Sequence, residues 1–113
     1  MPINVTPVAE GFSVAPQLTP NELAEAASLG FRAVINNRPD GEGGPGQPTA
    51  AQMQVAAQAA GLAYVHIPSA PSADDPAVID QMRAALKELP QPVLAFCRTG
   101  TRSGKLFRAA TGG

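Results

Sequence analysis

The stretch that decides the fold is Pro92–Arg108, which reads PVLAFCRTGTRSGKLFR. Residues 93–96 (VLAF) form a continuous apolar run, which is typical of a buried parallel strand. Cys97 is expected to be the last residue of that strand, and the polar residues 98–103 follow it as a short loop. A helix is predicted to begin near Arg102. The sequence therefore places a thiol between the end of a strand and the start of a helix.

The surroundings of Cys97 favour its anionic form. Amide N–H groups of a curled loop and of a helix N-terminus stabilise an anion, and neighbouring arginines do the same. Four of the eight Lys and Arg residues follow Cys97, whereas the last acidic residue of the chain is Glu88. Gly100 lies in the middle of the loop and offers no side chain to a core. A lone cysteine is most often an inert buried residue, but these features together indicate a thiolate nucleophile.

Length and composition indicate one globular domain over residues 1–113. A chain of this size buries about two thirds of its unfolded surface, and 44% apolar with 15% charged residues separates it from disordered chains. One cysteine, no leader and no long apolar run at the N-terminus favour a cytoplasmic location without a membrane partner. A pI near 5.7 gives no reason to expect a nucleic-acid partner. One Cys, one His and scattered acids do not make a metal site, and no organic cofactor is indicated.

The rest of the chain alternates helical and strand patterns, which is typical of an α/β fold. Strands are predicted near 12–14, 31–36, 62–67 and 93–97, helices near 20–29, 49–60, 76–89 and 102–110, and an edge or arm over 1–11. Thr19 and Glu22 fit a capping box at the first helix, and Leu29 and Val55 are expected to help pack the first two helices. Right-handed crossovers make the last three strands parallel, so the loops that follow them open at the edge where Cys97 lies.

The irregular segment 36–48 (NNRPDGEGGPGQP) leaves the carboxyl end of a predicted strand. Arg38 is therefore expected at the same edge as Cys97 and is a candidate anion-binding residue. Asp40 is a weaker candidate, because an Asp before Gly41 also suits an ordinary turn.

The second proline-rich loop, 68–76, leaves the same edge and carries two acids. Asp74 and Asp75 suit the N-terminus of the following helix, and one of them could also protonate a leaving group at a thiolate site. His66 is the only histidine of the chain. A histidine that bonds to the backbone is a commoner case than a catalytic one, so His66 is not assigned to the site.

The order of four stretches carries a family resemblance: FSVAPQLTP, GFRAVINNRPDGE, GLAYVHIP and PVLAFCRTGTRS. The chain resembles the bacterial beta-lactamase-hydrolase-like protein phosphatase-like domain family, a branch near the dual-specificity protein phosphatases, over nearly its whole length. The resemblance implies a protein-tyrosine-phosphatase-like three-layer fold, with a central, mostly parallel sheet flanked by helices. It also implies Cys97 as the nucleophile and Arg102 as the oxyanion-binding arginine.

The sequence departs from the usual phosphatase signature in one spacing and in one residue. Four residues rather than five separate Cys97 from Arg102, and Phe96 stands where the signature has His. The chain also stops at Gly113, directly after one helix, where the family usually continues. This is either a form trimmed at the C-terminus or a short member of the family.

The short loop makes sulfur transfer the leading hypothesis. A ring of amides closed by four residues is tighter, so a phosphoryl group has less room, and the pattern Cys-Arg-x-Gly-x-Arg also resembles the loop of rhodanese-type sulfurtransferases. Cys97 would take a sulfane sulfur from thiosulfate or a small persulfide and pass it from the Cys97 persulfide to cyanide or an acceptor thiol protein. Arg98 and Arg102 would bind the anionic donor.

Two alternatives stay open. In a phosphatase acting on phosphate esters, Cys97 would carry the phosphoryl group, Ser103 would aid release of the thiolate, and Asp74 or Asp75 would be the acid. In a non-catalytic binder of anions or phosphopeptides, the loop would bind without turnover. The predicted catalytic residues are Cys97, Arg102 and Asp75, and the predicted anion-binding residues are Arg98, Thr99, Gly100, Thr101, Ser103 and Arg38.

Overall fold

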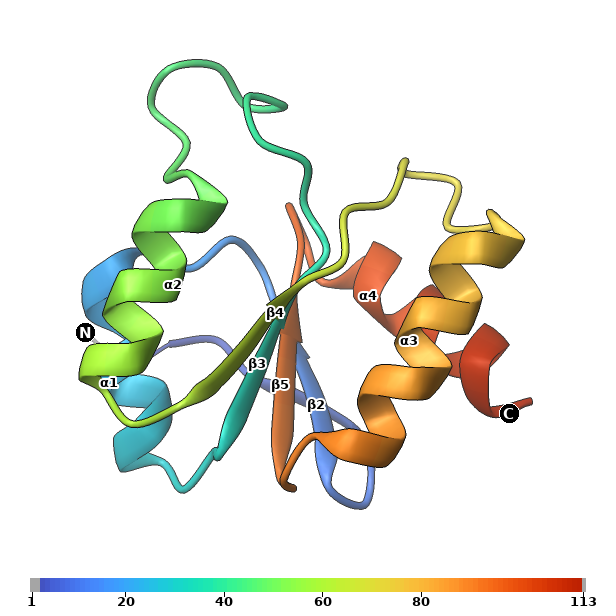
Figure 1. Ribbon diagram of the computed structural model, residues 1–113, viewed down its shortest axis with the longest axis horizontal. Helices are drawn as coiled ribbons and strands as arrows, with labels where there is room; N and C mark the ends of the chain where they lie inside the picture. The colour runs from blue at the N-terminus through green and yellow to red at the C-terminus, as the bar shows by residue number, and fades with distance from the viewer. Residues whose placement is uncertain (1–2, 113) are drawn as a thin grey trace.

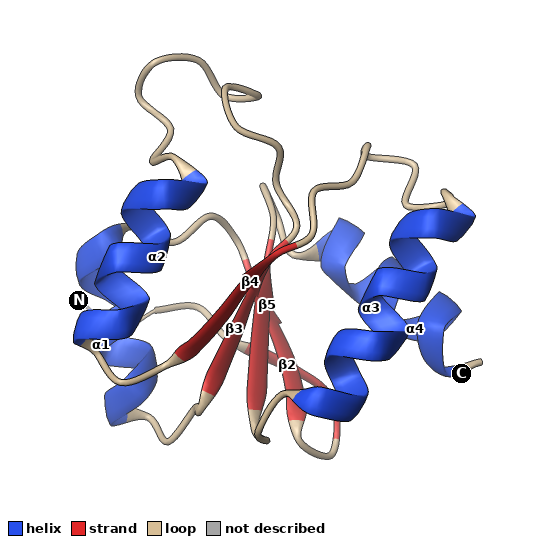
Figure 2. Ribbon diagram, in the orientation of Figure 1, coloured by secondary structure: helices blue, strands red, loops and turns tan. Residues whose placement is uncertain are grey.

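A five-stranded sheet forms the middle layer of the computed structural model, and two helices cover each of its faces (Figure 1). The structure describes residues 3–112. In chain order the elements are β1 (Thr6–Ala9), β2 (Phe12–Ala15), α1 (Pro20–Ser28), β3 (Ala33–Asn36), α2 (Ala50–Ala59), β4 (Ala63–His66), α3 (Pro76–Glu88), β5 (Val93–Phe96) and α4 (Thr101–Thr111). This is the predicted three-layer α/β fold, with α1 and α2 on one face and α3 and α4 on the other (Figure 2).

The strand order is β1-β2-β5-β3-β4, and only β1 runs antiparallel to its neighbour. β1 confirms the edge predicted over residues 1–11, of which residues 1 and 2 lie outside the described part of the chain. The parallel directions of the last three strands are confirmed as well. β5 lies between β2 and β3, with Ala95 opposite both Val14 and Ile35. The loops that follow β3 and β4 rise beyond the same end of the sheet (Figure 1). Cys97 follows β5 at this end, where sites of parallel sheets collect.

The apolar run of β5 is buried because helices cover both faces of the sheet. Val93 and Ala95 pack into the core beneath α3 and α4, while Leu94 and Phe96 pack into the core beneath α1 and α2. Successive side chains of a strand point to opposite faces. A strand between two cores therefore needs apolar residues at every position, which explains the sequence VLAF.

The helix ends follow local sequence signals. Thr19 caps α1, because its Oγ1 accepts from the Glu22 amide at 3.3 Å while Glu22 Oε1 accepts from the Thr19 amide at 2.8 Å. The predicted capping box is confirmed. The expectation that Leu29 and Val55 pack is wrong, since they are 62% and 67% exposed. Leu29 is the C-cap of α1, where the chain leaves the helix. Val55 lies only two residues from each buried position of α2, which places it on the opposite face.

None of the helices in the described part of the chain has both the length and the apolar character needed to cross a membrane.

Candidate active site

The candidate nucleophile follows β5 directly. The strand ends at Phe96, one residue earlier than expected, and Cys97 is 1% exposed. Gly100 donates its amide N–H to Cys97 Sγ at 3.0 Å. Gly100 is also the N-cap of α4 and has a φ of 95°, which residues with a side chain rarely adopt. A left-handed glycine thus turns an amide toward the sulfur at a helix N-terminus, an arrangement that stabilises a thiolate.

A cavity of about 720 Å³ opens beside Cys97. It is lined by Arg38, Glu42, Gly43, Pro71, Cys97, Arg98, Thr99, Thr101 and Arg102. These residues come from the loops that follow β3, β4 and β5 and from the start of α4. Three arginines and one acid leave the lining with an excess of positive charge, which favours an anionic ligand.

Arg102 is 7% exposed, and its two terminal nitrogens are occupied. Nη1 donates to Glu42 Oε2 and to the Ser69 carbonyl oxygen, both at 3.1 Å, and Nη2 donates to Glu42 Oε1 at 3.0 Å. Nε is buried and has no acceptor among the described residues. A buried N–H without an acceptor is costly and rare in folded proteins. Arg102 also lines the cavity, so this nitrogen is a candidate donor to an anion bound there.

Arg38 is buried next to Arg102 and shares its carboxylate. Its Nε donates to Glu42 Oε1 at 2.9 Å, and its Nη1 donates to Gln17 Oε1 at 3.2 Å. The backbone of Arg38 is also held, because its carbonyl oxygen lies 2.9 Å from His66 Nε2. The structure therefore brings Arg38 to the cavity as predicted, with a fixed side chain and a fixed backbone.

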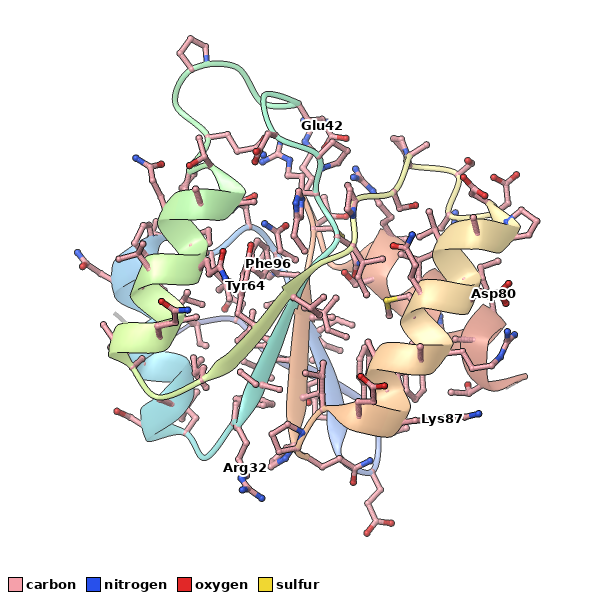
Figure 3. The ribbon with its side chains drawn as sticks, viewed as in Figure 1. Arg32, Glu42, Tyr64, Asp80, Lys87 and Phe96 are labelled. Atoms are coloured by element: carbon pink, nitrogen blue, oxygen red, sulfur yellow. The ribbon has the colours of Figure 1, made fainter. Side chains whose placement is uncertain are left out.

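Glu42 joins the two arginines above the carboxyl ends of the strands (Figure 3). Hydrogen bonds from Arg102 are the largest cause that lowers the pKa of the Glu42 carboxyl below its ordinary value. Burial opposes this effect, and Arg38 adds to it. Glu42 is therefore a carboxylate at neutral pH.

The structure brings most of the predicted loop residues to one place. Arg98, Thr99, Thr101 and Arg102 line the cavity with Cys97, and the Gly100 amide contacts the sulfur. Ser103 lies elsewhere, because it is fully buried behind the loop and its hydroxyl donates to Asn37 Oδ1 at 2.8 Å. Its predicted roles in anion binding and in release of the thiolate stay predictions.

The predicted acid does not line the cavity. Asp75 is the exposed N-cap of α3, and its Oδ1 accepts from the Ala77 amide at 2.9 Å. Asp74 accepts from the Ser72 hydroxyl at 2.8 Å. The capping interpretation of Asp75 is confirmed, whereas its catalytic role stays a prediction. His66 bonds to the backbone, as expected for a histidine outside the reacting groups.

Sequence reasoning missed Glu42. It lies in the segment 36–48, where only Arg38 and Asp40 were considered, and Asp40 accepts from the Ala50 amide at 2.8 Å at the start of α2. The only local signal was the spacing of Arg38 and Glu42. Opposite charges four positions apart can form an ion pair, as these two do. Nothing local indicates the pairing of Glu42 with Arg102, which lies 60 residues away.

No group of three or more His, Cys, Asp and Glu side chains that could hold a metal ion occurs within residues 3–112. The cavity instead offers cationic and N–H donors, which suit an anion.

The curated relatives are beta-lactamase hydrolase-like proteins. The protein of Xylella fastidiosa (strain Temecula1) is 33% identical over 105 residues, and that of Agrobacterium fabrum is 36% identical over 100 residues. The matches cover 93% and 88% of this chain but only 24% and 23% of the relatives. The chain thus spans about a quarter of their length, and a single catalytic domain over residues 1–113 stays a prediction.

Solved structures of similar fold include a candidate phosphatase and a phosphatase. A candidate phosphatase from Neisseria meningitidis is 33% identical with a TM-score of 0.81, over 90% of this chain and 72% of that one. Kinase-associated phosphatase, solved with its catalytic-site cysteine replaced by serine, is 16% identical with a TM-score of 0.71, over 98% of this chain and 76% of that one. The second likeness shows the fold alone.

The family model of the phosphatase-like domain of beta-lactamase hydrolase-like proteins matches residues 4–113. This match covers all five strands, the four helices and the Cys97 loop. The chain therefore belongs to the phosphatase-like domain family of beta-lactamase hydrolase-like proteins.

Proposed function

We propose that this chain hydrolyses phosphate monoesters through a phosphocysteine on Cys97. One observation carries the proposal: the sulfur of Cys97 and the unpartnered, buried Nε of Arg102 belong to residues that line the same cationic cavity. The family and the fold of the solved phosphatases support the same reaction. The substrate class is a small phosphate ester.

Two displacements at phosphorus complete the reaction. Cys97 thiolate attacks phosphorus, an S–P bond forms, and the P–O bond to the leaving group breaks with its electron pair on that oxygen. Water then attacks phosphorus and loses a proton, the S–P bond breaks, and inorganic phosphate and the thiolate are released. Arg102 Nε and the loop amides would bind the phosphoryl oxygens as charge develops on them.

Sulfur transfer, the first choice from the sequence, is less well supported than its phosphatase alternative. The observation that still favours it is the short loop, with four residues between Cys97 and Arg102. In that reaction Cys97 thiolate attacks the outer sulfur of thiosulfate, the S–S bond breaks and sulfite leaves. An acceptor thiolate then removes the outer sulfur from the Cys97 persulfide. The acceptor protein and the cytoplasmic location remain predictions.

The test compares the wild type with Cys97→Ser. We expect the wild type to release phosphate from 4-nitrophenyl phosphate and Cys97→Ser to release none. Intact-mass spectrometry after thiosulfate or glutathione persulfide tests the alternative in the same samples. A gain of one sulfur that cyanide removes, with no phosphate release, would establish sulfur transfer instead. Phosphate binding retained by both proteins, without turnover in either, would establish a non-catalytic binder.

A further inference from the structure

Glu42 is the one acidic residue that lines the cavity within the described part of the chain. We propose that Glu42 is a positioning residue for Arg102 and Arg38, and that the site therefore acts on phosphate esters whose leaving group departs without a proton from the enzyme. This inference rests on the proposed phosphatase function. It names the class of ester, and it excludes the acid that lines the cavity, Glu42, as a proton donor.

The contacts of Glu42 use both carboxylate oxygens as acceptors. Oε1 accepts from Arg38 Nε at 2.9 Å and from Arg102 Nη2 at 3.0 Å, while Oε2 accepts from Arg102 Nη1 at 3.1 Å. All three donors carry positive charge, and a guanidinium has no acceptor to offer. A protonated carboxyl would turn an O–H toward one of these donors. The geometry therefore requires the ionised form, which has no proton to give to a leaving group.

The same contacts fix the guanidinium of Arg102. Glu42 and the Ser69 carbonyl occupy both of its terminal nitrogens, so that the buried Nε remains as a donor without an acceptor. Gly43 lets the loop lie against the second arginine, since a Cβ at this position would stand 2.7 Å from Arg38 Nη2. Glu42 thus fixes one arginine at the cavity and holds the other beside it.

The other acids near this edge are occupied outside the cavity. Asp40 accepts from the Ala50 amide, Asp74 from the Ser72 hydroxyl and Asp75 from the Ala77 amide. When the P–O bond breaks, the leaving oxygen keeps the electron pair and takes its proton from water afterwards. Esters of acidic phenols meet this requirement, whereas esters of ordinary alcohols do not. General acid catalysis raises the reaction rate by about 10²–10⁴-fold. A site without a general acid therefore discriminates strongly between esters with good and with poor leaving groups.

The experiment measures kcat/KM with 4-nitrophenyl phosphate and with phenyl phosphate across pH. The proteins are the wild type, Glu42→Gln, Glu42→Ala and, as the matched acid variant outside the cavity, Asp75→Asn. We expect kcat/KM of the wild type to be about a hundredfold higher for 4-nitrophenyl phosphate than for phenyl phosphate. This is the lower end of the rate contribution that a general acid makes where one is present. Glu42→Gln keeps one acceptor oxygen but turns its NH2 group toward an arginine, and it should lose about tenfold. Glu42→Ala keeps no acceptor and should lose about a hundredfold through misplaced arginines.

The ratio between the two substrates separates positioning from proton donation. We expect the same ratio and the same basic limb of the pH profile in all four proteins. Equal losses in Glu42→Gln and Glu42→Ala that fall mainly on phenyl phosphate would show that Glu42 is the acid. A selective loss in Asp75→Asn would show that Asp75 is. Either result overturns the inference, and so does a wild type that hydrolyses both esters equally well.

A second measurement keeps the positioning role testable if no ester is hydrolysed, an outcome that would reject the proposed function. Inorganic phosphate should protect Cys97 from alkylation by iodoacetamide. We expect Glu42→Ala to need about tenfold more phosphate than Glu42→Gln for the same protection. If Glu42 acted only through its charge, both variants would bind phosphate equally and more tightly than the wild type, and the positioning role would be wrong.

Discussion

Arg102 is the residue that links the fold to the proposed chemistry. Its side chain is buried at the cavity, its terminal nitrogens are tied to Glu42 and Ser69, and its Nε lacks an acceptor. A positive charge alone does not explain this arrangement, because the planar fork of a guanidinium makes all of these contacts at once. The geometry of Arg102, as well as its charge, should therefore matter for turnover.

Arg102→Lys tests this point. Lysine keeps the charge but cannot bond to Glu42 and Ser69 while also presenting an Nε donor, so we expect kcat/KM for 4-nitrophenyl phosphate to fall about a hundredfold. Arg83→Lys is the matched control, because Arg83 pairs with the exposed Asp80 on α3. Steady-state kinetics and thermal unfolding of both variants give the comparison. Equal activity of Arg102→Lys and the wild type would contradict a role for the fork.

The ionisation of Glu42 predicts a pH dependence of stability. Arg102 lowers the pKa of Glu42 from its ordinary value of 4.5, so the folded state favours the carboxylate more than the unfolded state does. The resulting stabilisation is present above pH 4.5 and is lost as pH falls through the lowered pKa of the folded state. Urea unfolding of the wild type and Glu42→Gln should show a wild-type advantage at pH 7 that shrinks toward pH 3. If the wild type were more stable than Glu42→Gln by the same amount at every pH, the charge of Glu42 would not be the cause of the difference.

At the scale of single residues, the sequence predicted the residues of one contiguous loop but not their distant partners. Cys97, Arg98 and Arg102 are close in the chain, so strand, loop and helix patterns were enough to place them together. Glu42 meets Arg102 across 60 positions, and Ser103 meets Asn37 across 66. Such contacts depend on how strands are ordered in the sheet, which local patterns do not contain. Asp75 was a usable signal for a cap, because a cap is local.

Among the elements, the loop between β5 and α4 depends on one backbone conformation. Gly100 has a φ of 95° and directs its amide to Cys97 Sγ. A Cβ at Gly100 would meet only ordinary contacts, the nearest at 3.5 Å from the Ala15 backbone. The conformation, rather than crowding, therefore requires glycine here.

Gly100→Ala should cost about 1–2 kcal/mol of unfolding free energy, the penalty for a side chain in the left-handed region. It should also reduce turnover, because the relaxed loop would move its amide away from the sulfur. Gly104→Ala is the control within the same helix. Gly104 has no positive φ, and its nearest contact to an added Cβ is Arg108 Nη1 at 3.6 Å, so alanine there should leave stability equal or higher. The reverse order of stabilities would contradict this account of the loop.

The elements themselves were predicted well where their signals are local. The capping box at Thr19 and the buried run of β5 were both read correctly, because caps and apolar runs depend on neighbouring residues. Val55 was misplaced, because the alanine-rich sequence of α2 does not mark which face turns to the sheet. The buried residues of α2 are Met53 and Ala57, which lie four positions apart. Packing against the rest of the fold determines that this face of the helix is the buried one.

For the whole molecule, the strand order determines where the site lies. β5 pairs with β2 on one side and with β3 on the other, so the Cys97 loop emerges between the segments that carry Gln17 and Arg38. Right-handed crossovers predict parallel strands, but they do not predict which strand becomes central. The order had to come from the structure, and it explains how residues from three loops share one cavity.

Asn37 holds this edge of the molecule together from inside. It is fully buried after β3, its Nδ2 donates to the Ile67 carbonyl oxygen at 2.9 Å, and its Oδ1 accepts from Ser103 on α4. Its backbone continues the same network, since its N–H donates to Phe96 and its carbonyl accepts from Ser69. One side chain and its backbone thus join the ends of β3 and β5, the segment after β4, and α4.

Asn37→Ala should therefore lower the unfolding free energy by about 2–4 kcal/mol. Truncation leaves the Ser103 hydroxyl and the Ile67 carbonyl without this hydrogen-bond partner, at about 1–3 kcal/mol each, and it leaves a small cavity. Turnover should fall as well, because without its side-chain contacts the Asn37 backbone is held less firmly. The Asn37 carbonyl accepts from the Ser69 amide, and the Ser69 carbonyl in turn holds Arg102. Asn21→Ala, on the exposed side of α1, should change stability by less than about 0.5 kcal/mol. Urea unfolding at pH 7 measures both variants. If Asn37→Ala were as stable as Asn21→Ala, the buried network around Asn37 would not be what joins these loops.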